Sequence, residues 1–169
     1  IFDGNGDYSS GSILEYCVVE YGGDSSQRMV YADSSAPFIN YCTIRYSSYF
    51  GIYASNASLK ILNSTVTQNT GGGIQVSGSG DLTLSDDTIS NNGYGIENGV
   101  GVTNISDSTI KDNTGIGLYL RSPNDTVTTA YITNNLIDNN GLGLQIAGVD
   151  GSTHIVSGNT ITNNDSTNS

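Results

Sequence analysis

The sequence predicts an all-β fold, a right-handed parallel β-helix of about seven coils with three short strands in each coil. Three observations support this prediction: a repeat of roughly constant length, short strand-like segments bounded by turn residues, and an asparagine at one fixed position of the repeat. In such a single-stranded β-solenoid, each repeat forms one coil and stacks its side chains on equivalent side chains of its neighbours.

The repeat is marked by aliphatic residues at three positions, which we call the first, second and third anchors. The first anchors are Leu14, Ile39, Ile61, Leu84, Ile105, Ile132 and Val156. The second anchors follow five residues later and recur at steps of 25, 22, 23, 21, 27 and 24: Val19, Ile44, Val66, Ile89, Ile110, Ile137 and Ile161. The third anchors usually follow a glycine: Val30, Ile52, Ile74, Ile96, Leu118 and Leu144. Each coil is therefore expected to contain three strands.

The residues between the anchors favour strands and turns rather than helices. Segments rich in Ile, Val and Thr alternate with Gly, Asn and Ser, while the helix formers Ala, Glu, Lys and Leu never accumulate. Stacking coils about 4.8 Å apart lets each backbone group pair with the coils above and below. The sequence therefore predicts ladders of like residues along the solenoid axis.

Two such ladders are expected at a turn. Five asparagines fall three residues after a second anchor, and their amides are expected to hydrogen-bond along the axis: Asn69, Asn92, Asn113, Asn140 and Asn164. Five glycines precede third anchors, where a turn requires a positive φ or a close approach: Gly51, Gly73, Gly95, Gly117 and Gly143. Both sets are interpreted as structural.

Length and composition indicate one domain over residues 1–169. They also exclude two classes of partner. Charged residues make up only 12% of the chain, and five basic against sixteen acidic residues leave a net charge of −11. No cationic stripe is present to bind a phosphate backbone, so nucleic acid is not an expected partner. No apolar run approaches the length that crosses a bilayer, so membrane insertion is not expected either.

The repeat pattern closely resembles the parallel β-helix repeats of carbohydrate-binding proteins and sugar hydrolases, over residues 13–169. The opening segment Leu14-Glu-Tyr-Cys-Val-Val-Glu-Tyr-Gly-Gly looks like the entry coil of large secreted bacterial or archaeal surface proteins. This resemblance implies a secreted or cell-surface location and a place beside other modules. It is specific for the fold and weak for the function.

An outward row of side chains is the predicted binding site. The residue after each third anchor should point away from the core, because side chains alternate along a strand. This outward row comprises Tyr31, Tyr53, Gln75, Glu97, Tyr119 and Gln145. Tyrosine rings can stack on sugar faces while amides and carboxylates bond to hydroxyls, so a polysaccharide or other glycan is the expected partner. Structural stacking of tyrosines is the alternative.

Insertions in the repeat provide a second candidate region. Longer coils occur at residues 22–28, 121–130 and 147–153, and the last two place Arg121, Asp125 and Asp150 near one another in coil order. These residues would frame a shallow groove or bind a cation, with calcium as the candidate ion, or they are ordinary solvated loops. No other cofactor is expected.

Further residues are predicted to be structural rather than catalytic. Asp86-Asp87 aligns with a turn, and the lone His154 aligns with Leu59 and Leu82. Cys17 is expected to stack on Cys42, with a free thiol pair favoured over a disulfide. Tyr21 and Tyr46 form another aligned pair, flanked by Glu20 and Arg45. The candidate outward acids belong to different strands or coils and predict no catalytic site: Glu15, Glu20, Glu97, Asp112 and Asp138.

These observations favour a non-catalytic module that acts as a rigid spacer and a carbohydrate-recognising surface. The alternative is the core of a polysaccharide lyase or glycoside hydrolase whose catalytic residues lie on other coils or on a partner chain. The chain is expected to be a fragment of a larger exported protein. Its terminal coils would then contact neighbouring modules or associate end to end.

Overall fold

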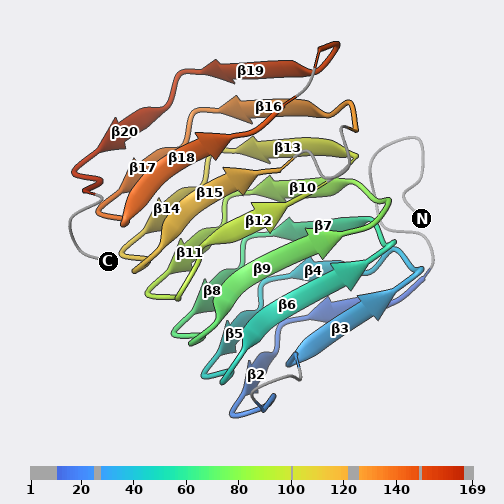
Figure 1. Cartoon of the computed structure of the whole chain (residues 1–169). Helices are drawn as coiled ribbons and strands as arrows, with labels where there is room; N and C mark the ends of the chain where they lie inside the picture. The colour runs from blue at the N-terminus through green and yellow to red at the C-terminus, as the bar shows by residue number, and fades with distance from the viewer. Residues whose placement is uncertain (1–10, 25–27, 100, 122–125, 149, 166–169) are drawn as a thin grey trace.

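The computed structural model describes residues 11–24, 28–99, 101–121, 126–148 and 150–165, which form twenty β-strands and no helix. The strands pass in turn through three parallel sheets that run along one axis (Figure 1). The first sheet contains β1 (Ile13–Glu15), β4 (Phe38–Asn40), β7 (Leu59–Leu62), β10 (Leu82–Ser85), β13 (Val102–Ser106), β16 (Thr129–Thr133) and β19 (Thr153–Ser157).

The other two sheets complete each coil. The second sheet contains β2 (Val18–Glu20), β5 (Thr43–Arg45), β8 (Thr65–Thr67), β11 (Thr88–Ser90), β14 (Thr109–Lys111), β17 (Leu136–Asp138) and β20 (Thr160–Thr162). The third sheet contains β3 (Val30–Asp33), β6 (Phe50–Ser55), β9 (Gly72–Ser77), β12 (Ile96–Asn98), β15 (Ile116–Leu120) and β18 (Leu142–Ile146). Coil 1 is β1–β3, coil 2 is β4–β6, and so on to coil 6 (β16–β18), while coil 7 has two strands among the described residues. The predicted β-helix is confirmed.

The three predicted sets of anchors form the centre of the core, and further buried residues such as Leu59, Val76 and Leu82 add to it. Each set pairs in register along its sheet, as in Ile39 with Ile61, Ile44 with Val66, and Ile52 with Ile74. In the central coils these side chains are fully buried, because each coil covers the next. Burial of stacked aliphatic groups is therefore the main source of stability, and the stacking sets the register between coils.

The predicted asparagine ladder lies inside the bend between the second and third sheets. The Nδ2 of Asn92 donates to Oδ1 of Asn113 at 3.1 Å, and Asn113 donates in the same way to Asn140 at 2.8 Å. Each Oδ1 also accepts the backbone N–H of the residue at the same position one coil earlier, as Asn113 does from Asn92 at 3.0 Å and Asn69 does from Ser47 at 2.9 Å. The ladder prediction is confirmed, and these amides satisfy buried backbone groups that water cannot reach.

The predicted glycines provide space for this ladder. A β-carbon added at Gly51 would lie 2.7 Å from Nδ2 of Asn69, and one at Gly143 would lie 2.7 Å from Nδ2 of Asn164. At Gly73 and Gly95 the nearest atom would be the carbonyl oxygen of the glycine in the next coil, so glycine is required here by close approach of the ladder or the backbone, rather than by a positive φ.

A second ladder, which the sequence analysis did not predict, lies inside the bend between the first and second sheets. The backbone N–H of Ser64 donates to Oδ1 of Asp87 at 2.7 Å, and that of Asp87 donates to the hydroxyl of Ser108 at 3.1 Å. The ladder continues to Asn135, whose Oδ1 accepts the backbone N–H of Ser108 and whose Nδ2 donates to Oδ1 of Asn159. Asp86, beside it, has φ of 60° and lies in the turn, as predicted.

The two cysteines occupy the first positions of this second ladder. Their Sγ atoms lie 3.4 Å apart and both thiols are free, in agreement with the prediction of a thiol stack. The N–H of Cys42 donates to the hydroxyl of Ser64, which joins the pair to the ladder. Burial and the hydrogen bond to Cys42 raise the pKa of the Cys17 thiol, so it remains protonated at neutral pH.

Candidate functional site

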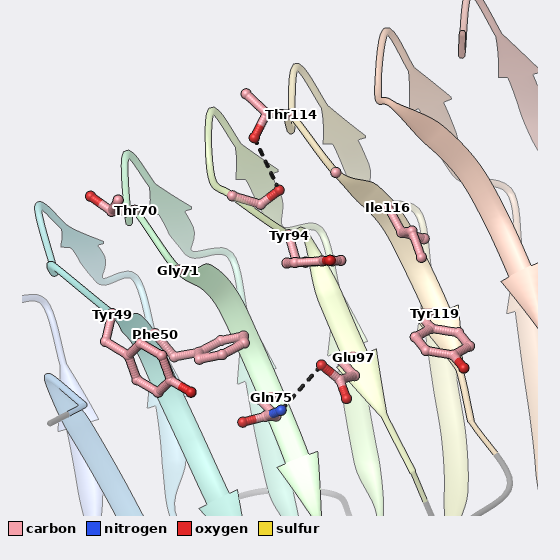
Figure 2. A pocket seen from close by; sticks show the side chains of 12 residues that line it. Tyr49, Phe50, Thr70, Gly71, Gln75, Tyr94, Glu97, Thr114, Ile116 and Tyr119 are labelled. Carbon is pink, nitrogen blue, oxygen red and sulfur yellow. Dashed lines mark hydrogen bonds between the residues drawn. The ribbon is translucent and has the colours of Figure 1, made fainter. Parts of the chain in front are cut away.

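A groove of about 900 Å³ runs along the third sheet and its preceding bend, across coils 2 to 5. Its volume lies at the upper end of the range for small-molecule sites, about 300–1,000 Å³. Figure 2 shows Tyr49 and Phe50 near one end, Tyr119 near the other and Tyr94 between them. The lining residues are Tyr49, Phe50, Thr70, Gly71, Gln75, Gly93, Tyr94, Glu97, Thr114, Gly115, Ile116 and Tyr119.

Glycines in successive coils form the floor of this groove. Gly71 and Gly93 lie against the backbone of the preceding coil, where a β-carbon would come within 3.0 Å of carbonyl oxygen atoms. Gly115 leaves room for the Tyr94 ring, whose Cδ1 would be 3.3 Å from a β-carbon at that position. Because no side chains fill the floor, the aromatic residues stand above it as walls.

The aromatic walls differ in how firmly they are held. A β-carbon at Gly72 would overlap the Phe50 ring, so this glycine lets Phe50 lie flat beside the sheet. Tyr49 packs edge-on against Phe50, with ring centroids 5.1 Å apart. Tyr94 is 45% exposed and Tyr119 is half-buried, so both present ring surface to a ligand.

A polar chain of three residues crosses the sheet beside the aromatic walls. Nε2 of Gln75 donates to Oε2 of Glu97 at 3.1 Å, and Nη1 of Arg121 donates to Oε1 of Glu97 at 2.8 Å. The Glu97 side chain is only 12% exposed, and this pairing compensates its loss of hydration. The carboxylate is thereby fixed in position and its charge is neutralised.

The tyrosines at the amino-terminal end of the outward row have other partners. The Arg28 guanidinium lies over the Tyr53 ring, 4.0 Å from its centroid, and the Tyr31 ring packs 5.6 Å from that of Tyr53. The Tyr53 hydroxyl bonds to that of Ser77 at 2.7 Å. One face of Tyr53 is thus already occupied by a cation, an interaction that stabilises this end of the sheet.

The structure aligns the whole predicted outward row and brings half of it into the groove. The six residues pair in one register along the third sheet: Tyr31, Tyr53, Gln75, Glu97, Tyr119 and Gln145. Gln75, Glu97 and Tyr119 line the groove, whereas Tyr31, Tyr53 and Gln145 lie outside its lining. The register is confirmed, and ligand binding by the row stays a prediction.

Tyr49, Phe50 and Tyr94 were not predicted as site residues. They lie in or next to the bend before the third sheet, where the number of residues differs between coils. One feature of the sequence indicates this site: coils 3, 4 and 5 each have a glycine at the same bend, at positions 71, 93 and 115. Three stacked glycines beside aromatic residues indicate a trough with aromatic walls.

The remaining acidic residues are dispersed over the solenoid. Glu15 accepts a hydrogen bond from Asn40 on the first sheet, and Glu20 pairs with Arg45 on the second sheet at 2.7 Å. Asp112 and Asp138 accept hydrogen bonds from Asn139 and Asn163 at the bend. These pairings are structural.

The second candidate region, formed by the longer coils at residues 121–130 and 147–153, lies partly outside the described residues. Asp125 lies outside the described residues, and Arg121 bonds to Glu97 of the groove. Among the residues that the structure describes, no group of three His, Cys, Asp or Glu side chains is arranged to hold a metal ion. His154 aligns with Leu59 and Leu82, as predicted, and its Nε2 bonds to the Thr128 hydroxyl at 2.9 Å.

Two stacked tyrosine pairs mark the bends of coils 1 and 2. The rings of Tyr21 and Tyr46 lie 4.9 Å apart, as predicted, and Arg45 lies 5.0 Å from the Tyr46 centroid. The rings of Tyr16 and Tyr41 lie 5.0 Å apart and almost parallel at the other bend. All four have positive φ, a conformation that is costly for an aromatic residue.

Comparison with known families agrees with this architecture. A family model for the right-handed β-helix region matches residues 3–83 and again residues 29–168. Comparisons with curated proteins and with solved structures gave no significant match. No helix long and apolar enough to span a bilayer occurs in the described part of the chain. Since the two matched segments together span nearly all 169 residues, the chain belongs to the right-handed β-helix family.

Proposed function

We propose that this chain is a non-catalytic carbohydrate-binding module that also serves as a rigid spacer in a secreted or cell-surface protein. The observation that carries the proposal is the groove, in which Tyr94 and Tyr119 stand beside the fixed Gln75–Glu97 pair. Sugar rings combine apolar C–H faces with hydroxyl edges. A site for them needs exposed aromatic faces and polar groups held in position, and the groove has both.

The rigidity of the site supports this proposal. Gln75, Glu97 and Tyr119 project from neighbouring strands of one sheet, and each strand is paired on both sides. A ligand would therefore meet side chains that are already ordered, and less conformational entropy is lost on binding.

The charges around the groove favour binding over hydrolysis. Glycoside hydrolases use two carboxylates on either side of the bond that breaks. Glu97 is the one carboxylate among the described residues that line the groove, and both of its oxygens are bound by neighbouring side chains. A carboxylate that two neighbouring side chains hold in position can accept hydrogen bonds from the hydroxyl groups of a sugar.

The spacer role follows from the repeat. Each coil contacts mainly its neighbours, so added coils lengthen the solenoid without altering its cross-section. Neutral polar residues cover its surface, and the net charge of −11 opposes nonspecific association with other acidic surfaces. Both properties suit a module that presents a binding surface at a distance from its attachment point.

Affinity electrophoresis in gels that contain soluble polysaccharides tests the proposal. We expect at least one polysaccharide to retard the chain, and Tyr119→Ala to remove that retardation while the melting temperature is maintained. Tyr131→Ala is the matched control, because Tyr131 is an exposed tyrosine on the first sheet, away from the groove. Unretarded migration in every gel, or equal retardation of the parent chain and Tyr119→Ala, would contradict the proposal.

A further inference from the structure

The dimensions of the groove indicate which glycan would occupy it. The lining residues come from four consecutive coils, from Tyr49 in coil 2 to Ile116 and Tyr119 in coil 5. The groove therefore crosses the strands and runs parallel to the solenoid axis (Figure 2). With about 4.8 Å between strands, four coils provide about 14 Å of length.

The spacing of the coils matches one type of sugar chain. In an extended β-1,4-linked pyranose chain, each residue advances the chain by nearly the distance between adjacent coils. Successive residues are also turned over, so every second residue presents the same face. Tyr49 and Tyr94 lie two coils apart, which corresponds to about 9.6 Å along the axis and to the interval between equivalent sugar faces.

The charge of the groove points to a neutral polymer. Among the described residues that line the groove, Glu97 is the one charged side chain, and Arg121 neutralises it from outside the lining. The chain as a whole carries a net charge of −11, which repels polyanions. The remaining polar lining consists of an amide, hydroxyl groups and backbone carbonyls, which suit sugar hydroxyls.

We infer that the groove binds a neutral, extended β-1,4-linked polysaccharide along the solenoid axis, with one sugar residue for each coil. This inference rests on the proposed function and specifies its ligand. Tyr49 and Tyr94 contact alternate sugars from the bend. Tyr119 and the Gln75–Glu97 pair contact the same chain from the sheet.

Isothermal titration calorimetry with oligosaccharides of defined length tests the inference. The probes are β-1,4-glucan and β-1,4-mannan oligomers of two to six residues. Oligomers of α-1,4-glucan serve as a control of identical composition and curved shape, and α-1,4-linked oligogalacturonate serves as a charged control. We expect affinity for a β-1,4 series to rise up to about four residues, the number that spans the groove, and then to stay constant. The α-1,4-glucan and oligogalacturonate series should bind at least about tenfold more weakly.

Variants locate the binding to the groove. Tyr49→Ala and Tyr94→Ala should each weaken binding of the β-1,4 hexamer by about tenfold, whereas Tyr94→Phe keeps the ring and most of the affinity. Tyr131→Ala should bind like the parent chain. Circular dichroism melting of each variant distinguishes a lost contact from a lost fold.

The outcomes separate this inference from the proposed function. If α-1,4-glucan or oligogalacturonate binds more tightly than the β-1,4 series and the binding depends on Tyr119, the inference fails and the proposed function stands. Affinity for the β-1,4 series that does not depend on chain length overturns the axial placement. If no oligosaccharide binds, and no polysaccharide retards the chain in affinity electrophoresis, both are overturned.

Discussion

At the scale of single residues, Asp87 is the most unusual group in the core. Its side chain lies in the second ladder, where the neighbouring coils contribute serine and, further along, asparagine. Desolvation raises the pKa of this carboxyl to about 7, and hydrogen bonds from the N–H groups of Ser64 and Ser85 oppose the rise only in part. The folded protein therefore favours the neutral acid over the carboxylate.

This pKa predicts how stability depends on pH. Because the folded pKa exceeds the ordinary pKa of an aspartate, 3.8, the contribution of Asp87 to stability is fully present below about pH 4. It is lost as the pH rises to about 7, at a cost on the order of 2–4 kcal/mol. Asp87→Asn should be more stable than the parent chain at pH 8, since asparagine already fills this position in coils 6 and 7, and the difference should shrink towards pH 4.

Melting temperatures of the two chains between pH 4 and pH 8 give the measurement. Asp107→Asn is the control, because Asp107 is exposed in the equivalent turn of the next coil. Parallel curves for the parent chain and Asp87→Asn would show that the carboxyl is not held in its neutral form.

At the scale of elements, the first ladder ties each bend to the next. Oδ1 of Asn113 accepts the backbone and side-chain N–H groups of Asn92, while its own Nδ2 donates to Asn140 and to the carbonyl of Ile89 at 3.2 Å. One amide thus satisfies groups in three coils. The bend between the second and third sheets is held by side chains as much as by backbone pairing.

Removal of one amide from this ladder should destabilise the solenoid. Asn113→Ala leaves buried donors and acceptors without partners, and we expect a loss of about 1–3 kcal/mol in the free energy of unfolding. Urea denaturation measures the loss. Thr114→Ala, at the exposed neighbouring position, should change stability by less than about 0.5 kcal/mol. Equal stability of Asn113→Ala and the parent chain would contradict the role assigned to the ladder.

The ladder of like residues was predicted from the sequence, whereas the ladder of mixed residues was not. Aliphatic anchors and five asparagines recur at fixed offsets, so their stacking follows from the repeat alone. The second ladder combines cysteine, serine, aspartate and asparagine at one offset, and only the hydrogen bonds reveal their common role. Tyr94 was not predicted as a site residue because bends of unequal length obscure which residues are aligned. The Glu97–Arg121 pair was not predicted because its two members lie in different coils.

At the scale of the whole molecule, the described part of coil 7 exposes aliphatic groups that the central coils bury. Ile161 is 46% exposed and Val156 is 38% exposed, whereas Ile110 and Ile105, two coils earlier, are fully buried. Strands β18, β19 and β20 also form sheet edges among the described strands. Because two such exposed ends can cover one another, we propose that this end associates with another copy of the chain.

Light scattering over a range of protein concentrations tests this proposal with the 169-residue chain. We expect the apparent mass to rise with concentration, and Ile161→Lys to suppress the rise because a charge would be placed against the apolar contact. Leu136→Lys is the control, since Leu136 is an exposed aliphatic residue of β17, a strand that is paired on both sides. A mass that stays monomeric at every concentration would contradict the proposal.

The equal coils also determine how the molecule would respond to tension. Hydrogen bonds between coils lie along the axis, so a pull on the two ends peels the terminal coils first and detaches one coil at a time. Each coil contains 21 to 27 residues, judged by the steps between second anchors, and would release about 70–90 Å of extended chain. The solenoid would thus be stiff at low load and lengthen in nearly equal increments at high load, which would limit the force transmitted from one end to the other.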